Sequence, residues 1–342
     1  MSELRRDPLE RRWVVIAPER GVRPLYARAR ESVATAADDC PFCPGREAQT
    51  LAEICALREP ASAPDGPGWR VRVVPNRYPA LRIEGDLARR ADGLCDRVAG
   101  VGAHEVIIET PEHALELDEL PRAQLRDVLL CLRDRRTDLY RDPRLRCVVW
   151  FRNRGFQAGS SVPHPHSQLL ALPEVPTRLR RRLKSSRAHR RRTGRCLTCD
   201  LIAAELDDGR RIVRDAGGWV TWAPYASRFP FELSIAPRSD PGDFAALDAA
   251  AAESLADALQ DAVRRVRAGL GDPDYNLVLH AAPRRTLAER DGGADFHWQF
   301  LLFPRLMPIA GFEWGTDDAV NATPPEEAAR HLRSAAAPTT AR

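Results

Sequence analysis

The chain has 342 residues, with 52 basic and 48 acidic side chains, a formal net charge of +4 and 44% apolar residues. This length allows two domains with separate cores, and no apolar run approaches the 18 residues needed to cross a membrane. The first residues contain no apolar segment of the secretory-signal type, so we expect a cytoplasmic globular protein. Lys184 is the only lysine, which argues against Schiff-base catalysis and a lysine-containing phosphate loop.

The first half of the chain alternates short strand patterns with one long helical pattern. It begins with a Cys-x-x-Cys pair, Cys40 and Cys43, and an amphipathic helix is predicted at 120–140. Strands are predicted at 69–83, 104–109, 147–151 and 164–173. Period-two strands around a single helix are typical of an antiparallel sheet covered by helices, which is an α+β unit.

The second half repeats this order of elements. A second pair, Cys196 and Cys199, precedes a long helical pattern at 244–270. Strands are predicted at 219–237, 275–280 and 296–305. We therefore predict two tandem halves at 1–177 and 196–335, each an antiparallel sheet with a covering helix, joined by a basic connector at 178–195.

The connector is unusually basic, with nine arginines and Lys184 between residues 178 and 195. Such a run is typical of a nucleic-acid-binding patch or of a solvated helix. The run contains no aromatic side chains for base stacking, and charge elsewhere is balanced. A solvated helix is therefore preferred, and a zinc-bearing nucleic-acid-binding module is the remote alternative.

The two Cys-x-x-Cys pairs indicate zinc sites, because zinc prefers four sulfur or nitrogen ligands and each pair supplies two from one tight turn. Histidines are the natural source of the remaining ligands. Aligning the halves places His164 opposite His297, and both are candidate structural ligands. The same alignment places His166 opposite Gln299, so that only the first half has a second histidine. His166 is therefore the catalytic candidate.

The surroundings of His166 suggest phosphate chemistry. The preceding loop, 155–161, contains two glycines and two serines whose N–H groups and hydroxyls could cradle a phosphate. A neutral imidazole beside that cradle can attack phosphorus and form a covalent phosphoramidate. Gln168 would lie on the same strand face and could donate to a phosphate oxygen. The alternative is that His164 and His166 are both zinc ligands.

HPHSQ at 164–168 after this loop, in a duplicated chain with CPFC at 40–43, resembles the galactose-1-phosphate uridylyltransferase family of the histidine-triad superfamily. Other matching segments are RRDPLERRWVVIAPERGVRP (5–24), VVPNRYPAL (73–81), FPFE (229–232), FHW (296–298) and AGFEWGT (310–316). The resemblance implies two histidine-triad-like halves and a ping-pong exchange. In that exchange the histidine attacks the α-phosphorus of a nucleoside-diphosphate sugar, and sugar 1-phosphate leaves.

The resemblance also assigns roles to individual residues. His166 would be the nucleophile, and Gln168 would hold the transferred phosphate. The implied substrate-binding residues are Asn76, Asn153, Gly159, Ser160, Ser161, Gly311, Phe312 and Glu313. One structural Zn²⁺ would use Cys40, Cys43, His104 and His164. A second would use Cys196, Cys199, His297 and Asp240, which replaces a histidine of related chains.

The substrate and the partners follow from the same resemblance. The first expectation is uridylyl transfer between UDP-glucose and a hexose 1-phosphate such as galactose 1-phosphate. Met307 and Phe312 stand where well-studied bacterial enzymes have a lysine and a tyrosine. The motifs are more similar to a divergent group that includes plant ADP-glucose phosphorylase, so adenylyl transfer to phosphate is the alternative, and hydrolysis a third. We expect a homodimer and neither a nucleic-acid nor a membrane partner.

Overall fold

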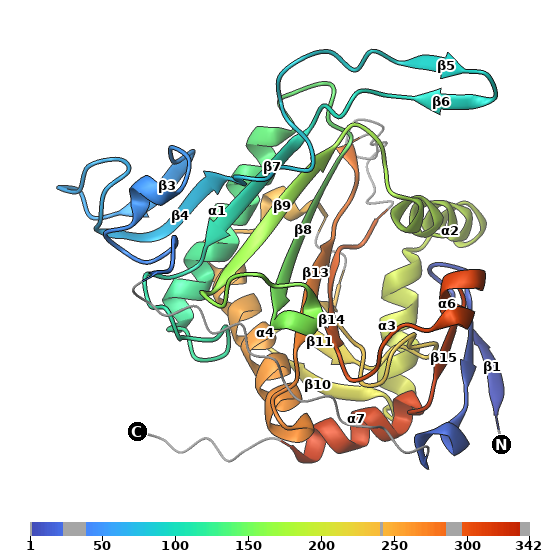
Figure 1. The fold of residues 1–342 in the computed structure, drawn as a ribbon. Helices are drawn as coiled ribbons and strands as arrows, with labels where there is room; N and C mark the ends of the chain where they lie inside the picture. Colours follow the sequence, from blue (N-terminus) through green and yellow to red (C-terminus); the bar gives the residue numbers. More distant parts are fainter. Residues whose placement is uncertain (1, 23–38, 240–241, 285–295, 336–342) are drawn as a thin grey trace.

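Ten strands form one continuous antiparallel sheet through the middle of the molecule (Figure 1). The computed structural model describes residues 2–22, 39–239, 242–284 and 296–335. Within them the sheet order is β10-β11-β12-β14-β13-β8-β9-β7-β4-β3. The first half supplies β3 (Cys55–Arg58), β4 (Trp69–Pro75), β7 (Ala103–Ile108), β8 (Cys147–Arg154) and β9 (His166–Leu172). The second half supplies β10 (Ile212–Ala216), β11 (Trp219–Trp222), β12 (Leu233–Pro237), β13 (Tyr275–His280) and β14 (Gln299–Pro304).

The two halves of the chain contribute their strands in the same order. Counted outward from the centre, β8, β9, β7, β4 and β3 correspond in order to β13, β14, β12, β11 and β10. A separate sheet is predicted from the sequence for each half, and the structure corrects this detail, because β8 pairs with β13 and places Asn153 opposite Asn276. This pairing gives hydrogen-bond partners to two edges that would otherwise be open.

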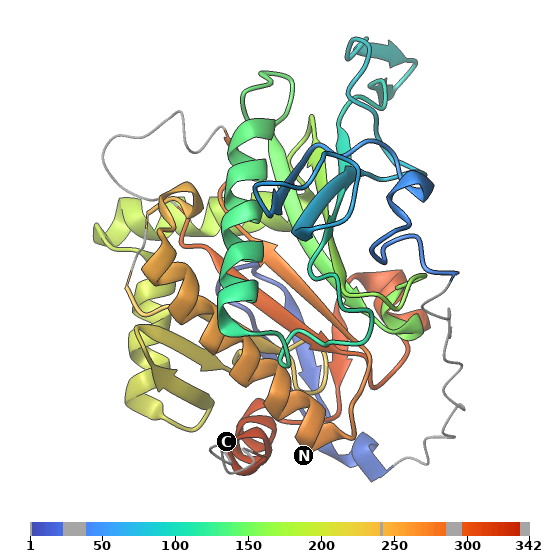
Figure 2. The same cartoon turned by 90° about the vertical axis from the view of Figure 1, so that its left-hand side faces the viewer.

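Helices α1 (Arg122–Leu139) and α4 (Ala249–Leu270) cover one face of the sheet and contact each other (Figure 2). The Asp248 side chain accepts a hydrogen bond from Ala251 N–H at 2.8 Å and caps the start of α4. The helix ends before Gly271, which has the left-handed conformation common at helix ends. The main hydrophobic core lies between these helices and the sheet and draws side chains from both halves. The halves therefore share one core.

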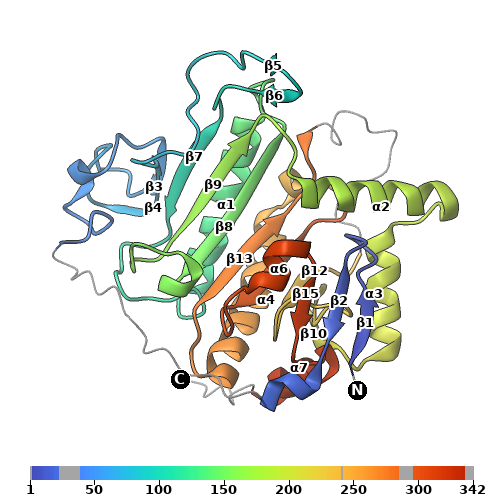
Figure 3. The same ribbon diagram turned by 45° about the vertical axis from the view of Figure 1, so that its right-hand side comes forward.

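The opposite face of the sheet differs between the two halves. Over the second half lie α2 (Thr177–Thr193), α6 (Gly311–Thr316) and a small sheet (Figure 3). The small sheet consists of β1 (Glu3–Arg6), β2 (Trp13–Ile16) and β15 (Ala319–Asn321). All six residues of β14 are buried as a result, whereas alternate residues of β8 and β9 remain partly exposed. The first half of this face, which we call the open face, is accessible to a ligand.

The remaining elements lie at the periphery. They are η1 (Pro18–Val22), η3 (Glu47–Gln49), the hairpin β5 (Arg90–Asp92) and β6 (Cys95–Arg97), η4 (Phe156–Ala158), α3 (Leu197–Asp208), η5 (Phe244–Ala246) and α7 (Pro325–Ser334). The basic connector is helical as preferred from the sequence, but α2 is not wholly solvated, because Leu179, Arg182 and Ser185 are buried. No described helix is both long and apolar enough to cross a membrane.

Candidate active site

His166 is the first residue of β9 and its side chain is buried, with 7% of the residue exposed. Its Nδ1 lies 2.8 Å from the carbonyl oxygen of His164. A carbonyl only accepts hydrogen bonds, so Nδ1 carries the proton and Nε2 keeps its lone pair. Burial is the largest influence on the ring and lowers the pKa of His166, which favours the neutral form. A neutral imidazole with a free lone pair on Nε2 can act as a nucleophile.

Gln168 lies two residues further along β9 and therefore on the same face as His166. Its Oε1 is 2.8 Å from Nε2 of His104 and 3.4 Å from Nδ2 of Asn76. The Asn76 side chain is itself held, because its Oδ1 accepts a hydrogen bond from Tyr78 N–H at 2.9 Å. The structure thus brings three predicted site residues, Asn76, His166 and Gln168, to one face. His104, which was predicted to be a zinc ligand, lies beside them.

The glycine- and serine-rich loop is fastened to the second half of the chain. Asn276 Nδ2 donates to Asn153 Oδ1 and to the Ala158 carbonyl, both at 2.8 Å. Asp274 accepts a hydrogen bond from Gln157 N–H at 2.8 Å. Sequence reasoning missed Asp274 and Asn276. The internal repeat could have pointed to them, because the strand 275–280 is the counterpart of the strand 147–154, which leads into this loop.

Within the loop, glycine is required by the backbone. Gly155 has φ of 85° and ψ of 164°, and Gly159 has φ of 87° and ψ of 20°. Ser160 Oγ donates to the Val162 carbonyl at 2.8 Å, whereas Ser161 is exposed. Of the predicted phosphate contacts, Ser161 is therefore the hydroxyl that faces solvent, and Ser160 shapes the loop.

The first metal-type cluster contains Cys40, Cys43, His113 and His164, whose ligand atoms all lie within 4.8 Å of one another. Nε2 of His164 lies 2.8 Å from the Thr110 carbonyl, so Nδ1 faces the cluster. Two thiols and two imidazoles are a donor set that suits tetrahedral zinc, and a carbonyl on the far nitrogen is the usual way to orient a ligand histidine. The four residues could hold a metal ion.

His113 replaces the predicted ligand His104, and the register of β7 and β9 explains the error. His104 pairs with Leu170, six residues beyond His164, which corresponds to roughly 20 Å along a strand. The chain after β7 instead runs beside the segment that precedes β9, as the Glu109 N–H to Pro165 carbonyl bond of 3.1 Å shows. His113 follows there and reaches His164, at a ring-centroid distance of 5.3 Å.

A second cluster unites Cys196, Cys199 and His297, again with ligand atoms within 4.8 Å of one another. Nε2 of His297 lies 3.0 Å from the Pro237 carbonyl, which repeats the arrangement of His164 in the first half. The expected fourth ligand, Asp240, lies outside the described residues. Two sulfurs and one nitrogen also suit zinc, and these three residues could hold a metal ion.

The predicted C-terminal substrate residues do not join the others. Gly311, Phe312 and Glu313 lie in α6, which contacts β15, away from the start of β9 (Figure 3). The Phe312 side chain is half-exposed, and Glu313 accepts a hydrogen bond from Ala310 N–H at 3.1 Å. Within one chain these residues and His166 belong to different surfaces.

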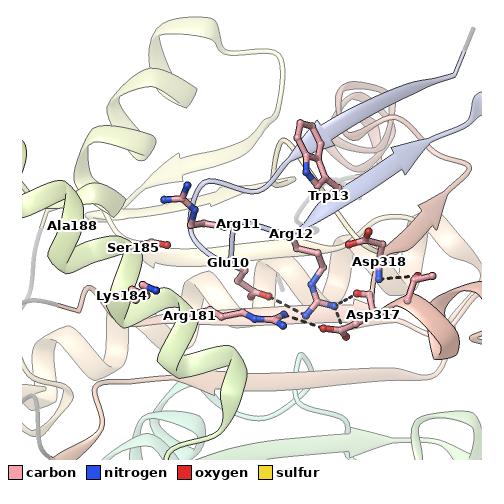
Figure 4. A pocket seen from close by; sticks show the side chains of 11 residues that line it. Glu10, Arg11, Arg12, Trp13, Arg181, Lys184, Ser185, Ala188, Asp317 and Asp318 are labelled. Carbon is pink, nitrogen blue, oxygen red and sulfur yellow. Dashed lines mark hydrogen bonds and ion pairs between the residues drawn. The ribbon is translucent and has the colours of Figure 1, made fainter.

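A cavity of about 650 Å³ lies near α6, between α2 and the turn that joins β1 to β2 (Figure 4). None of the predicted site residues lines it. Arg12 and Arg181 both pair with Asp317 there, at 2.9 and 3.0 Å. Both arginines are already engaged with a carboxylate, and the His166 side chain does not line this cavity, so it is not the phosphate site sought around His166.

Comparison with known proteins identifies the family. The sequence profile described as galactose-1-phosphate uridyl transferase, N-terminal domain, matches residues 1–176. An ADP-glucose phosphorylase of Arabidopsis thaliana is 30% identical over 97% of this chain and 92% of its own length. The chain belongs to the galactose-1-phosphate uridyl transferase family. It is therefore an enzyme of the nucleotidyltransferase type.

Two further comparisons cover nearly the whole chain. A galactose-1-phosphate uridylyltransferase of Streptomyces lividans is 30% identical over 98% of this chain and 87% of its own length. The crystal structure of the Arabidopsis thaliana ADP-glucose phosphorylase with bound ADP-glucose matches with a TM-score of 0.82 at 30% identity, covering 97% of this chain and 99% of that one. Family members with both activities are thus similar to this chain along its length.

Proposed function

We propose that this family member transfers a nucleoside monophosphate group through a covalent intermediate on His166. Nε2 of His166 attacks the α-phosphorus of a nucleoside-diphosphate sugar, an N–P bond forms, and the bond to the leaving sugar 1-phosphate breaks. A second phosphate then attacks the same phosphorus and releases the histidine. The observation that carries the proposal is the bond from Nδ1–H to the His164 carbonyl, which leaves the lone pair on Nε2.

Other residues of the open face stabilise the phosphate during both steps. Gln168 lies on the same strand face as His166, and its amide N–H group donates to a non-bridging oxygen of the transferred phosphate. Ser161 supplies a further hydroxyl donor from the loop, whereas the Gly159 N–H already donates to the Phe156 carbonyl and shapes the loop. Asn76 and Asn153 lie on either side of this strand and contact the nucleotide. Negative charge that develops on the phosphate oxygens is therefore stabilised by neutral hydrogen-bond donors that are already in position.

We infer that Cys40, Cys43, His113 and His164 hold a structural Zn²⁺ and that Cys196, Cys199 and His297 contribute to a second one. The metal would cross-link segments of the chain and would supply no chemistry to the reaction. The carbonyl of His164 accepts the hydrogen bond from His166 Nδ1–H, so ordering His164 also orders the nucleophile. The proposed role of the first zinc is to hold that carbonyl in place.

Two further proposals concern organisation. The matching strand order of the halves supports a tandem duplication in which only the first half kept a histidine, His166, at the position of Gln299. The separation of Phe312 and Glu313 from His166 supports a homodimer, in which a second copy would bring α6 to the open face. Size measurement in solution tests the dimer, and a monomer at micromolar concentration that is fully active would exclude it.

The first candidate reaction is uridylyl exchange between UDP-glucose and galactose 1-phosphate or another hexose 1-phosphate. The second candidate is phosphorolysis of ADP-glucose, in which inorganic phosphate accepts the adenylyl group. The TM-score of 0.82 with a phosphorylase that has ADP-glucose bound favours this second candidate. Both use the same steps at His166 and differ in the base and in the acceptor.

Intact-protein mass after mixing with UDP-glucose or ADP-glucose tests the mechanism and the base together. We expect an added UMP or AMP on the wild type and none on His166→Gly. His331→Gln is the control, because His331 is an exposed histidine of α7. Adduct formation by His166→Gly would refute the proposed nucleophile, and absence of an adduct with both donors would refute this reaction class for these substrates.

A further inference from the structure

His104 lies beside Gln168 with a defined protonation pattern. Nδ1 of His104 is 3.2 Å from the backbone N–H of Ala80. A backbone N–H can only donate, so Nδ1 is the acceptor and the ring proton lies on Nε2. Nε2–H then donates to Oε1 of Gln168 at 2.8 Å. One backbone contact therefore selects the tautomer of the ring.

This tautomer in turn selects the orientation of the Gln168 amide. An amide can present either its oxygen or its nitrogen, and His104 Nε2–H can donate only to the oxygen. Asn76 Nδ2 lies 3.4 Å from Gln168 Oε1 and 3.3 Å from His104 Nε2. With the proton on Nε2 of His104, both nitrogens are donors, and both address the Gln168 oxygen. The Gln168 Nε2 hydrogens have no hydrogen-bond partner in the described part of the chain, and they point away from His104. They are the donors available to a ligand on the open face.

The sheet register makes this contact possible. His104 on β7 lies opposite Leu170 on β9, one pleat from Gln168, which lies opposite Val106. Residues two apart on a strand share a face, so both polar side chains project from the open face and meet diagonally. Ala80 and Asn76 both belong to the segment that follows β4, so the hydrogen-bond chain joins three parts of the chain: this segment, β7 and β9.

We propose that His104 is a positioning residue that fixes the Gln168 amide with its N–H group toward the transferred phosphate. The inference rests on the proposed function, because the phosphate in question is that of the nucleoside monophosphate transferred through His166. Without His104, the Gln168 amide can rotate and present its oxygen to an anion, which repels it. The phosphate therefore binds to the Gln168 N–H group, whose orientation is set by two successive hydrogen bonds, from Ala80 to His104 and from His104 to Gln168.

A double-mutant cycle tests the coupling. The variants are His104→Leu, Gln168→Ala and the pair, with His331→Leu as control, and the measurement is the single-turnover rate of nucleotidyl adduct formation. We expect Gln168→Ala to slow this rate about 100-fold or more and His104→Leu about tenfold or more. The pair should equal Gln168→Ala alone within about threefold, because His104 acts only through Gln168. Losses that multiply in the pair would overturn the proposal.

Two measurements separate positioning from a merely structural role. His104→Gln keeps a side-chain N–H donor and should recover most of the rate, whereas His104→Leu should not. Zinc content and the free energy of unfolding should be unchanged in both. A loss of rate that follows a loss of zinc or of folding in His104→Leu would contradict the proposal.

A spectroscopic measurement keeps the test independent of turnover. ¹⁵N-histidine NMR, assigned by comparison with His104→Leu, should show His104 in the Nε2–H form, and Gln168→Leu should shift that signal. An Nδ1–H ring would overturn the positioning role even if the enzyme is active. If no adduct forms with either donor but His104 shows the Nε2–H form coupled to Gln168, then the proposed function fails and the hydrogen-bond chain stands.

Discussion

Replacing Gly155 with alanine should destabilise the protein far more than the same change at Gly159. At Gly155 an added Cβ would lie 1.9 Å from Oδ1 of Asp274, so the carboxylate must move. At Gly159 the nearest atom to an added Cβ is Nδ2 of Asn153 at 3.7 Å, an ordinary contact. Both glycines have positive φ, but the ψ of 164° at Gly155 belongs to a region that only glycine readily adopts.

The expected cost at Gly155 has two parts. The backbone strain contributes about 1–3 kcal/mol. Moving Asp274 breaks its hydrogen bond to Gln157 N–H, and a hydrogen bond to a charged group contributes about 1.5–3 kcal/mol. Together they predict a loss of about 2.5–6 kcal/mol for Gly155→Ala. Gly159→Ala should cost about 1–2 kcal/mol, because the left-handed backbone conformation is then the sole source of strain.

Urea unfolding followed by tryptophan fluorescence measures both losses in the presence of zinc. The released loop should also slow nucleotidyl adduct formation more in Gly155→Ala than in Gly159→Ala. If the two variants lose the same free energy of unfolding to within about 0.5 kcal/mol, the role of Asp274 as the anchor of this loop is refuted.

His113→Ala should remove one bound zinc, whereas His104→Ala should keep it; elemental analysis showing the reverse would contradict the cluster in the structure. Burial raises the pKa of Glu232 from 4.5 to about 7, so the native state binds a proton that the unfolded chain releases, and stability falls as pH rises between these values. Glu232→Gln should remove up to ~3 kcal/mol of this decline, measured by urea unfolding at pH 5 and pH 8; an equal decline in the variant would exclude Glu232 as its cause. Arg152→Met should cost about 3–5 kcal/mol by leaving the buried Glu109 unpaired. Adding Glu109→Leu should recover most of that loss, and a double variant less stable than the single one would show that the pair is favourable in itself.

The local pattern of the sequence was sufficient to locate the two long helices and most of the central strands. The helix predicted at 120–140 is α1, Arg122–Leu139, and the strand predicted at 275–280 is β13, Tyr275–His280. These agree because helix and strand periodicities are properties of neighbouring residues. The tight Cys-x-x-Cys turns and the loop before His166 are also local, and both lie where they were expected.

The partners of these local features were decided by tertiary structure. His104 and His113 are equally plausible ligands by composition, and only the register of β7 against β9 places His113 beside His164 and His104 beside Gln168. The pairing of β8 with β13, which merges the halves and brings Asn276 to the loop, joins residues more than 100 positions apart. A sequence pattern records which face a side chain occupies, whereas register and strand pairing are set by the packing of the whole core.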